Sequence, residues 1–252
     1  MPETWSLVLI LVVAVSVVLY GFSKTGMPVA GVMAGPIIAA ALGPAVATGF
    51  VVPLLILGDF MALALYRSHA DWHLIRRLVP GVLVGFVLTA LLFEFASMIL
   101  VSRILGLLIL TSVLLEVWRL RTEKSVTDDH PGIENKLAIA FFGTLTGMTT
   151  MGANAGGAAM TLYLVKMRVS MLAFMGTATW FFMILNFIKV PFVVSLHLLT
   201  WNSLLISLCF IPALAVGGVV GALAFRRMNP KVFTTVALIV SALAALWLII
   251  MG

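Results

Sequence analysis

The sequence has very little charge for its length. Of 252 residues only 15 are Lys or Arg and 9 are Asp or Glu, whereas hydrophobic residues make up 63% of the chain. A soluble core of this size does not need so much apolar surface, so lipid or other helices must surround most side chains. The composition excludes an ordinary soluble protein and predicts an all-α, polytopic integral membrane protein.

Cysteine and the usual catalytic motifs are also scarce. The single cysteine, Cys209, cannot form an intramolecular disulfide. The chain has no H-E-x-x-H, G-x-S-x-G or G-x-x-x-x-G-K-[ST] motif, and no histidine–carboxylate cluster within its apolar segments. We therefore expect no enzyme, no metal site and no cofactor. The net charge is +6, but the charged residues lie mainly between apolar segments, which argues against a nucleic-acid partner.

Basic residues are missing before the first apolar stretch, which follows Met-Pro-Glu-Thr-Trp. No small-residue cleavage site clearly follows that stretch either. We therefore expect a retained membrane segment rather than a signal peptide.

Ten apolar segments separated by polar breaks predict two halves of five segments each. The only long hydrophilic stretch, at 119–136, contains Asp-Asp-His-Pro-Gly, which is typical of a turn. It divides the chain into a first membrane repeat at 1–118 and a second, inverted repeat at 137–252. The segments cover roughly residues 5–20, 27–43, 45–66, 78–95, 98–118, 137–151, 154–168, 171–196, 203–225 and 231–251.

Matching residues in the two halves support the repeat. The clearest match is a glycine spacing that occurs twice, because Gly21, Gly26 and Gly31 correspond to Gly147, Gly152 and Gly157. Further pairs are Thr48 with Thr177, Asp71-Trp72 with Thr200-Trp201, and Pro80 and Gly85 with Pro212 and Gly217. Paired breaks in two halves of a membrane protein are typical of a transporter's binding site. The alternative is that glycine and proline are common in membrane helices, so that some matches are fortuitous.

The basic residues predict the orientation in the membrane. Twelve of the 15 lie in alternate connections, namely Arg67, Arg76, Arg77, Arg119, Arg121, Lys124, Lys136, Lys166, Arg168, Arg226, Arg227 and Lys231. The positive-inside rule therefore places the central linker in the cytoplasm and both termini outside. The first two segments of each half are short for a bilayer of about 30 Å, so each pair forms either two spans or one re-entrant hairpin. The sequence leaves both alternatives open.

Both glycine motifs carry groups that can hold an anion. Ser23-Lys24-Thr25-Gly26-Met27-Pro28 has a capping hydroxyl followed by proline, which is typical of a helix start. A helix N-terminus presents unpaired N–H groups and a positive dipole. The expected binding residues of the two motifs are Lys24, Thr25, Gly26, Thr149, Thr150, Gly152 and Asn154. The alternative is that the glycines only allow close helix packing and the hydroxyls bond to their own backbone.

The prime candidates among the ionisable residues in and beside the apolar segments are Lys24, Asp59 and Lys189. An intramembrane charge is expensive, so each is a functional hypothesis by default. Asp59 and Lys189 follow Thr48 and Thr177 by 11 and 12 residues, so they occupy near-equivalent places in the two halves. Asn186 lies one helical turn before Lys189 and can act with it on one ligand. The alternatives are a snorkelling lysine and an aspartate that joins two helices.

These features together resemble the TauE/SafE sulfite exporter family, also described as toluene sulfonate uptake permeases. The resemblance rests on GFSKTGMPVAGVMAGPIIAAALGPAVATG at 21–49, on VVPLLILGD at 51–59 followed by ALYRSHADW at 64–72, and on MGTATWFFMILNFIKVPF at 175–192. It implies a multi-pass inner-membrane carrier, often an exporter, of sulfite, sulfonates or related organosulfur and carboxylate anions. It also implies coupling to an ion.

The predicted function is secondary transport of such small anions by alternating access between inverted halves in the lipid bilayer. Ammonium, amide and hydroxyl donors in a dry pocket suit a sulfonate or sulfite anion. Asp59 is the expected site of proton coupling, because a buried carboxyl group can bind and release a proton. The competing hypotheses are a passive anion channel, a membrane scaffold and a lipid-modifying enzyme. The sequence does not indicate an oligomeric state.

Overall fold

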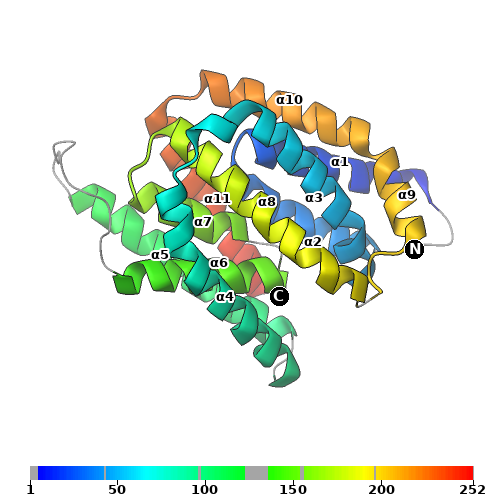
Figure 1. Cartoon of the computed structure of the whole chain (residues 1–252), viewed down its shortest axis with the longest axis horizontal. Coiled ribbons are helices and arrows are strands. Elements are labelled where there is room, and N and C mark those ends of the chain that lie inside the picture. Colours follow the sequence, from blue (N-terminus) through cyan, green and yellow to red (C-terminus); the bar gives the residue numbers. More distant parts are fainter. Residues whose placement is uncertain are drawn as a thin grey trace. The chain divides into compact units, whose positions relative to one another are not determined.

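The computed structural model describes residues 5–42, 44–95, 98–122, 136–153, 156–195 and 197–251, and the regular elements in these ranges are all helices (Figure 1). The α-helices are α1 (Leu7–Thr25), α2 (Gly31–Leu42), α3 (Pro44–Tyr66), α4 (Trp72–Phe95), α5 (Met98–Thr122), α6 (Lys136–Ala153), α7 (Gly156–Lys166), α8 (Met171–Ser195), α9 (Trp201–Cys209), α10 (Ile211–Arg227) and α11 (Pro230–Met251). Two short 3-10 helices are η1 (Pro28–Ala30) and η2 (Arg67–His69). The all-α fold class is confirmed.

Polar residues at the sequence breaks start several of these helices. The carboxylate oxygen Oδ1 of Asp71 accepts the backbone N–H groups of His73 and Leu74, at 2.9 and 3.2 Å, and so caps α4. Thr200 and Ser203 form a reciprocal capping box at the start of α9. Such caps bind N–H groups that the first turn of a helix leaves unpaired.

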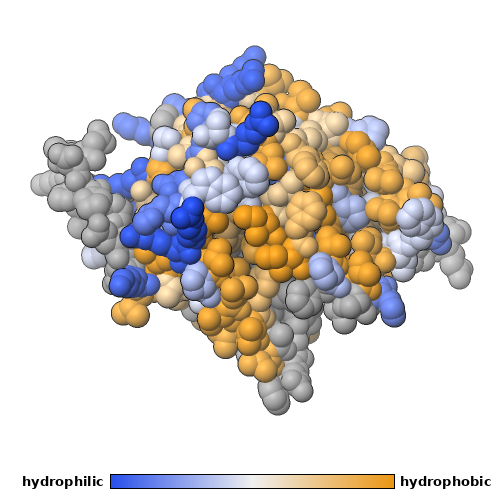
Figure 2. Space-filling model, in the orientation of Figure 1, coloured by the Kyte–Doolittle hydropathy of each residue, from blue (hydrophilic) through white to orange (hydrophobic). Residues whose placement is uncertain are grey.

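Among the described residues, three helical stretches are long and apolar enough to cross a membrane: Leu7–Thr25, Gly49–His69 and Met171–Pro191. The pair α9 and α10 passes the same test together, but the two helices meet at a bend of 51°. Many large apolar side chains on the helices are exposed, such as Leu107 at 60% and Val87 at 60%. Figure 2 shows hydrophobic residues over much of the drawn face. In water such a surface would drive aggregation, so lipid is its solvent.

The helix boundaries differ from the predicted segments, and three differences have a clear physical reason. The segment at 203–225 is two helices, because the chain bends at Phe210 and Pro212 begins a new first turn. Helix α4 starts at Trp72, so the amphipathic stretch before residue 78 belongs to the helix. Helix α1 continues through Gly21 to Thr25, because glycine lowers helix stability without preventing the helix.

The chain forms two compact units, each with helices from both halves of the sequence. The first unit contains residues 1–70 and 175–228, and the second contains residues 71–174 and 229–252. This division differs from the predicted repeats, whose boundaries at 118 and 137 stay a prediction.

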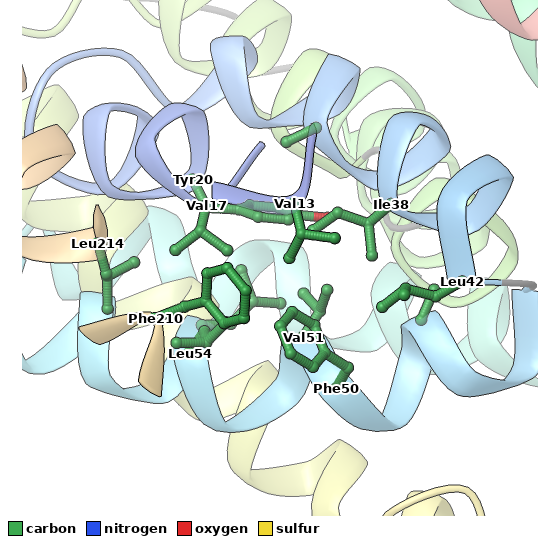
Figure 3. Packing of buried hydrophobic residues seen from close by; sticks show 13 residues of the cluster. Val13, Val17, Tyr20, Ile38, Leu42, Phe50, Val51, Leu54, Phe210 and Leu214 are labelled. Carbon is green, nitrogen blue, oxygen red and sulfur yellow. The ribbon is translucent and has the colours of Figure 1, made fainter. Parts of the chain in front are cut away.

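An apolar cluster fills the first unit between α1, α2, α3 and the junction of α9 with α10 (Figure 3). Phe50 and Phe210 meet edge to face, with their ring centroids 5.6 Å apart. Val17 and Leu54 are fully buried in the same cluster. Moving such a side chain from water into the cluster is favourable by about 1.5–3 kcal/mol. Where the surroundings are lipid, close packing between the helices provides the stabilisation instead. The cluster holds α1 against α3.

Glycines allow the closest helix contact within each unit. In the first unit α10 lies along α1 (Figure 1), and a Cβ atom on Gly217 would collide with the backbone carbonyl oxygen of Val18. In the second unit α4 packs on α6, and a Cβ atom on Gly85 would collide with the backbone carbonyl oxygen of Thr144. Small residues at such crossings let two membrane helices approach backbone to backbone.

Candidate functional site

A buried ion pair joins α1 to α3 inside the first unit. The ammonium nitrogen Nζ of Lys24 lies 2.5 Å from the carboxylate oxygen Oδ1 of Asp59. The side chain of Asp59 has no exposed surface, and that of Lys24 is 11% exposed. Removing two charges from water is expensive, and only their mutual attraction and good hydrogen bonds compensate the loss. The pair is therefore a site of high electrostatic energy within an apolar unit.

Asn186 of α8 completes the coordination of this carboxylate. Its amide nitrogen Nδ2 donates a hydrogen bond to the second oxygen of Asp59, Oδ2, over 2.6 Å. Asn186 is 3% exposed, so the bond lies in the interior. Both oxygens of Asp59 therefore have donors, from a charged group on one side and a neutral group on the other.

A second lysine, Lys189, lies on the same helix as Asn186. Lys189 is 7% exposed and follows Asn186 by three residues on α8. The Nζ atom of Lys24 also lies 5.5 Å from the ring centroid of Phe182, within the range of a cation–π contact. The structure thus brings two lysines, one aspartate and one carboxamide together in the first unit.

Gly58 makes room for the lysine that reaches Asp59. A Cβ atom on Gly58 would lie 2.9 Å from Cγ of Lys24 and 3.6 Å from its Cβ. The hydrocarbon stem of Lys24 therefore runs over the backbone of α3 at Gly58, one residue before the carboxylate. Any larger side chain at this position would displace the stem.

The end of α1 is tied to its neighbours through its polar groups. The hydroxyl of Thr25 donates to the carbonyl oxygen of Gly218 over 2.6 Å. The hydroxyl of Tyr66 donates to the carbonyl oxygen of Thr25, also over 2.6 Å. The backbone N–H of Gly26 donates to the carbonyl oxygen of Phe22 at 2.8 Å. These bonds hold the last turn of α1, and with it Lys24, in place.

The expected helix start at Ser23 and Thr25 is wrong. The hydroxyl of Ser23 donates to the carbonyl oxygen of Tyr20 over 2.8 Å, and α1 runs on to Thr25. The next helical residues are those of η1 from Pro28, and α2 begins only at Gly31. The hydroxyls bond to carbonyl groups of their own and a neighbouring helix, since a hydroxyl in lipid takes the nearest acceptor. A Cβ atom on Gly26 would lie 3.0 Å from the Cα atom of Gly221, so the two helices pack closely here, as the packing alternative predicts.

The residues of the second glycine motif belong to the second unit. Thr149 and Thr150 are buried on α6, and the hydroxyl of Thr149 donates to the carbonyl oxygen of Leu145 over 2.7 Å. Gly152 lies in the last turn of the same helix. Asn154 lies outside the described residues. The structure thus gathers Lys24, Asn186, Lys189 and Asp59 in one unit, and the role of the second motif stays a prediction.

Sequence reasoning named all four of these residues but missed that Lys24 and Asp59 are partners. A signal for the pairing was present, because a basic and an acidic residue both stood in the apolar part of the first half, and membrane charges pair with one another. It also missed Gly58, which precedes Asp59 directly.

A family model described as "Sulfite exporter TauE/SafE" matches residues 6–248. The chain belongs to the TauE/SafE sulfite exporter family. The match extends from the first turn of helix α1 to the last turn of α11, so it includes both compact units. No curated protein and no solved structure matches the chain. TauE/SafE membership identifies a multi-pass membrane protein of a transporter family, which agrees with its apolar helices.

Proposed function

We propose that this TauE/SafE protein is a secondary transporter that exports small sulfur-containing or carboxylate anions, such as sulfite or sulfonates. The observation that carries the proposal is the buried group of Lys24, Asp59, Asn186 and Lys189 within the first unit. Charges at membrane depth are costly and are retained for substrate or ion pathways. A structural link between helices needs one pair of charges, and this group contains a second lysine.

The chemistry of this group suits an oxyanion. Ammonium groups donate short, charge-assisted hydrogen bonds to sulfite, sulfonate and carboxylate oxygens. We assign anion binding to Lys24 of α1 and to Asn186 and Lys189 of α8, since Lys24 and Asn186 both bond to Asp59 and Lys189 follows Asn186 by one helical turn. Thr25 and Gly26 support Lys24 through the end of α1. Further donors from Thr149, Thr150, Gly152 and Asn154 are part of the same proposal.

The proposed setting is the inner membrane, with the linker at 119–136 in the cytoplasm and both termini outside. The distribution of Lys and Arg supports this orientation. The two chain halves would be inverted repeats, and alternating access would come from their movement around the anion. Reporter fusions that placed the linker outside would contradict this topology.

Coupling to protons is assigned to Asp59, because it is the acidic group of the buried cluster. A carboxyl group that is fully buried and held by one cation can change its protonation only together with its partner. A transporter coupled in this way accumulates its anion when a pH gradient is imposed. A passive anion channel, the main competing hypothesis, would only equilibrate the anion.

The decisive experiment is counterflow in proteoliposomes with a panel of sulfite, sulfonates and carboxylates. We expect Lys189→Ala to abolish anion flux, and Asp59→Asn to keep flux while removing its dependence on the pH gradient. The matched control is Lys136→Ala, which removes an exposed lysine from the start of α6 and should leave flux unchanged. Normal, pH-coupled flux in both test variants would refute the assignment, and flux that never exceeds equilibration would favour the channel.

A further inference from the structure

Asp59 already pairs with Lys24, the cation that the proposed function assigns to the substrate. Lys24 points its ammonium group at Asp59 Oδ1, and Asp59 is completely buried. A carboxylate side chain of the protein thus stands where a carboxylate, sulfite or sulfonate group of a substrate would bind. An anion of the same chemistry can reach Lys24 only in competition with it.

We propose that the transported anion displaces Asp59 from Lys24 and that Asp59 takes up a proton as this happens. This inference rests on the proposed function and adds the direction of coupling. The exchange is balanced: a monoanion and one proton from water enter, the Lys24–Asp59 pair separates, and the products are a Lys24–anion pair and a neutral Asp59 carboxylic acid. The net charge of the site does not change.

The burial of Asp59 is the physical reason for the linked proton. If Lys24 turned to an exogenous anion while Asp59 stayed ionised, an uncompensated charge would remain inside the protein, which costs several kcal/mol. Protonation removes that cost. Since the coupling between two bound species is reciprocal, low pH must strengthen anion binding as much as the anion favours protonation.

Asn186 is suited to both states of the carboxyl group. Its carboxamide donates to ionised Asp59 through Nδ2. The same carboxamide also carries an acceptor oxygen, to which a protonated Asp59 can donate. A purely structural partner for an ionised aspartate would need donors alone.

In the described part of the chain, the helices around α3 carry few titratable groups. Those on α1 are Lys24 and Tyr20, and α8 carries Lys189. Helix α2 has none, α9 has only the exposed Cys209, and α10 has Arg226 and Arg227 in its last turn. The exposed Arg67 and His69 lie in η2, beyond the end of α3. Lys189 is therefore the alternative proton acceptor that an experiment has to separate from Asp59.

The consequence is co-transport of the anion and the proton in the same direction. Each monoanion that crosses carries one proton with it, so the cycle moves no net charge. Export of the anion from the cytoplasm would remove acid as well as the anion.

The test uses methanesulfonate, whose charge is constant across the neutral pH range, with the purified full-length protein. We expect binding of each methanesulfonate to take up one proton from a weakly buffered solution. The apparent Kd should fall about tenfold for each unit by which the pH is lowered, as one linked proton requires. Binding without proton uptake would overturn the inference but leave the proposed binding and transport of the anion standing. Failure of sulfite, methanesulfonate and acetate to bind at all would refute the proposed function itself.

Two variants identify the proton acceptor. Asp59→Asn should bind methanesulfonate at least as tightly as the unchanged protein, with no proton uptake and no dependence on pH. Asp71→Asn, which changes an aspartate at the start of α4, should keep the one-proton uptake. Proton uptake that survived in Asp59→Asn would assign the proton to Lys189 and overturn the inference. The measurement on the unchanged protein stands even if Asp59→Asn does not fold.

Discussion

The two compact units are built on the same kind of helix contact but carry different chemistry. In the first unit α1 meets α10 through Gly21, Gly217 and Gly221, and in the second unit α6 meets α4 through Gly147 and Gly85. Under the predicted repeat alignment these are equivalent helices, since Gly21 corresponds to Gly147 and Gly217 to Gly85. The position on α6 that corresponds to Lys24 on α1 is Thr150. Lys24 follows Gly21 by three residues, and Thr150 follows Gly147 by three residues.

The same glycine contacts thus occur in a unit with buried charges and in a unit where a hydroxyl replaces the lysine. Helix packing therefore does not depend on the charge of the site. Glycine contacts set how closely two helices lie, whichever side chains follow. The aspartate and both intramembrane lysines belong to the first unit, because α8 contributes Asn186 and Lys189 to it. The second unit carries the hydroxyls of the second glycine motif, and that of Thr149 is bonded to a carbonyl group of its own helix. The following predictions test this independence, beginning with the largest effect.

Lys24→Met should have the largest effect, because it leaves Asp59 buried without a counter-charge. We expect a loss of about 3–5 kcal/mol in the free energy of unfolding, together with loss of anion flux. Thermal unfolding in detergent and flux in proteoliposomes measure the two. The double variant Lys24→Met with Asp59→Leu should recover stability but not flux. Recovery of flux in the double variant would show that the pair has only a structural role.

Gly217→Ala and Gly85→Ala should destabilise the protein by similar amounts, about 1–3 kcal/mol each. In both cases the new methyl group meets the backbone of the neighbouring helix. Thermal unfolding of the two variants should therefore give similar shifts. The neighbouring residues Val216 and Val84 are 56% and 52% exposed, and their alanine variants serve as controls with little effect. A strong effect in one unit alone would contradict the equivalence of the two contacts.

Gly58→Ala should weaken anion binding without unfolding the first unit. The added methyl group displaces the stem of Lys24 and forces it from its preferred rotamer, at a cost of about 0.5–1.5 kcal/mol. Binding of methanesulfonate and the melting temperature measure the two properties. Leu65→Ala, at an exposed position on the same helix, is the control. Unchanged binding would mean that Lys24 does not contact the anion.

Thr149→Val should have the smallest effect, within about twofold in flux, because its hydroxyl is bonded to a carbonyl of its own helix. Thr111→Val on α5 is a matched control, since Thr111 donates in the same way to Leu107 over 2.9 Å but is exposed. A loss of flux as large as that of Lys24→Met would give the second unit an equal part in the chemistry and so contradict the comparison.

The sequence by itself determined the solvent and the class of the protein. A 63% apolar chain with 10% charge lies mostly in lipid, where a helix satisfies all its backbone polar groups within one segment. Its polar breaks also located most helix ends, because a cap such as Thr200 acts locally. The rarity of charge in apolar segments was enough to select Lys24, Asp59 and Lys189.

Only the tertiary structure decided which of these groups are partners. The ion pair joins residues 35 positions apart in sequence, and Asn186 is another 127 positions from Asp59. Such contacts depend on how α1, α3 and α8 pack, which no local pattern encodes. The same holds for the glycines of the first motif, which the sequence left open between binding and packing. The packed helices bring Gly26 against Gly221 and bond Thr25 to Gly218, because polar groups in a membrane interior must find partners within the protein.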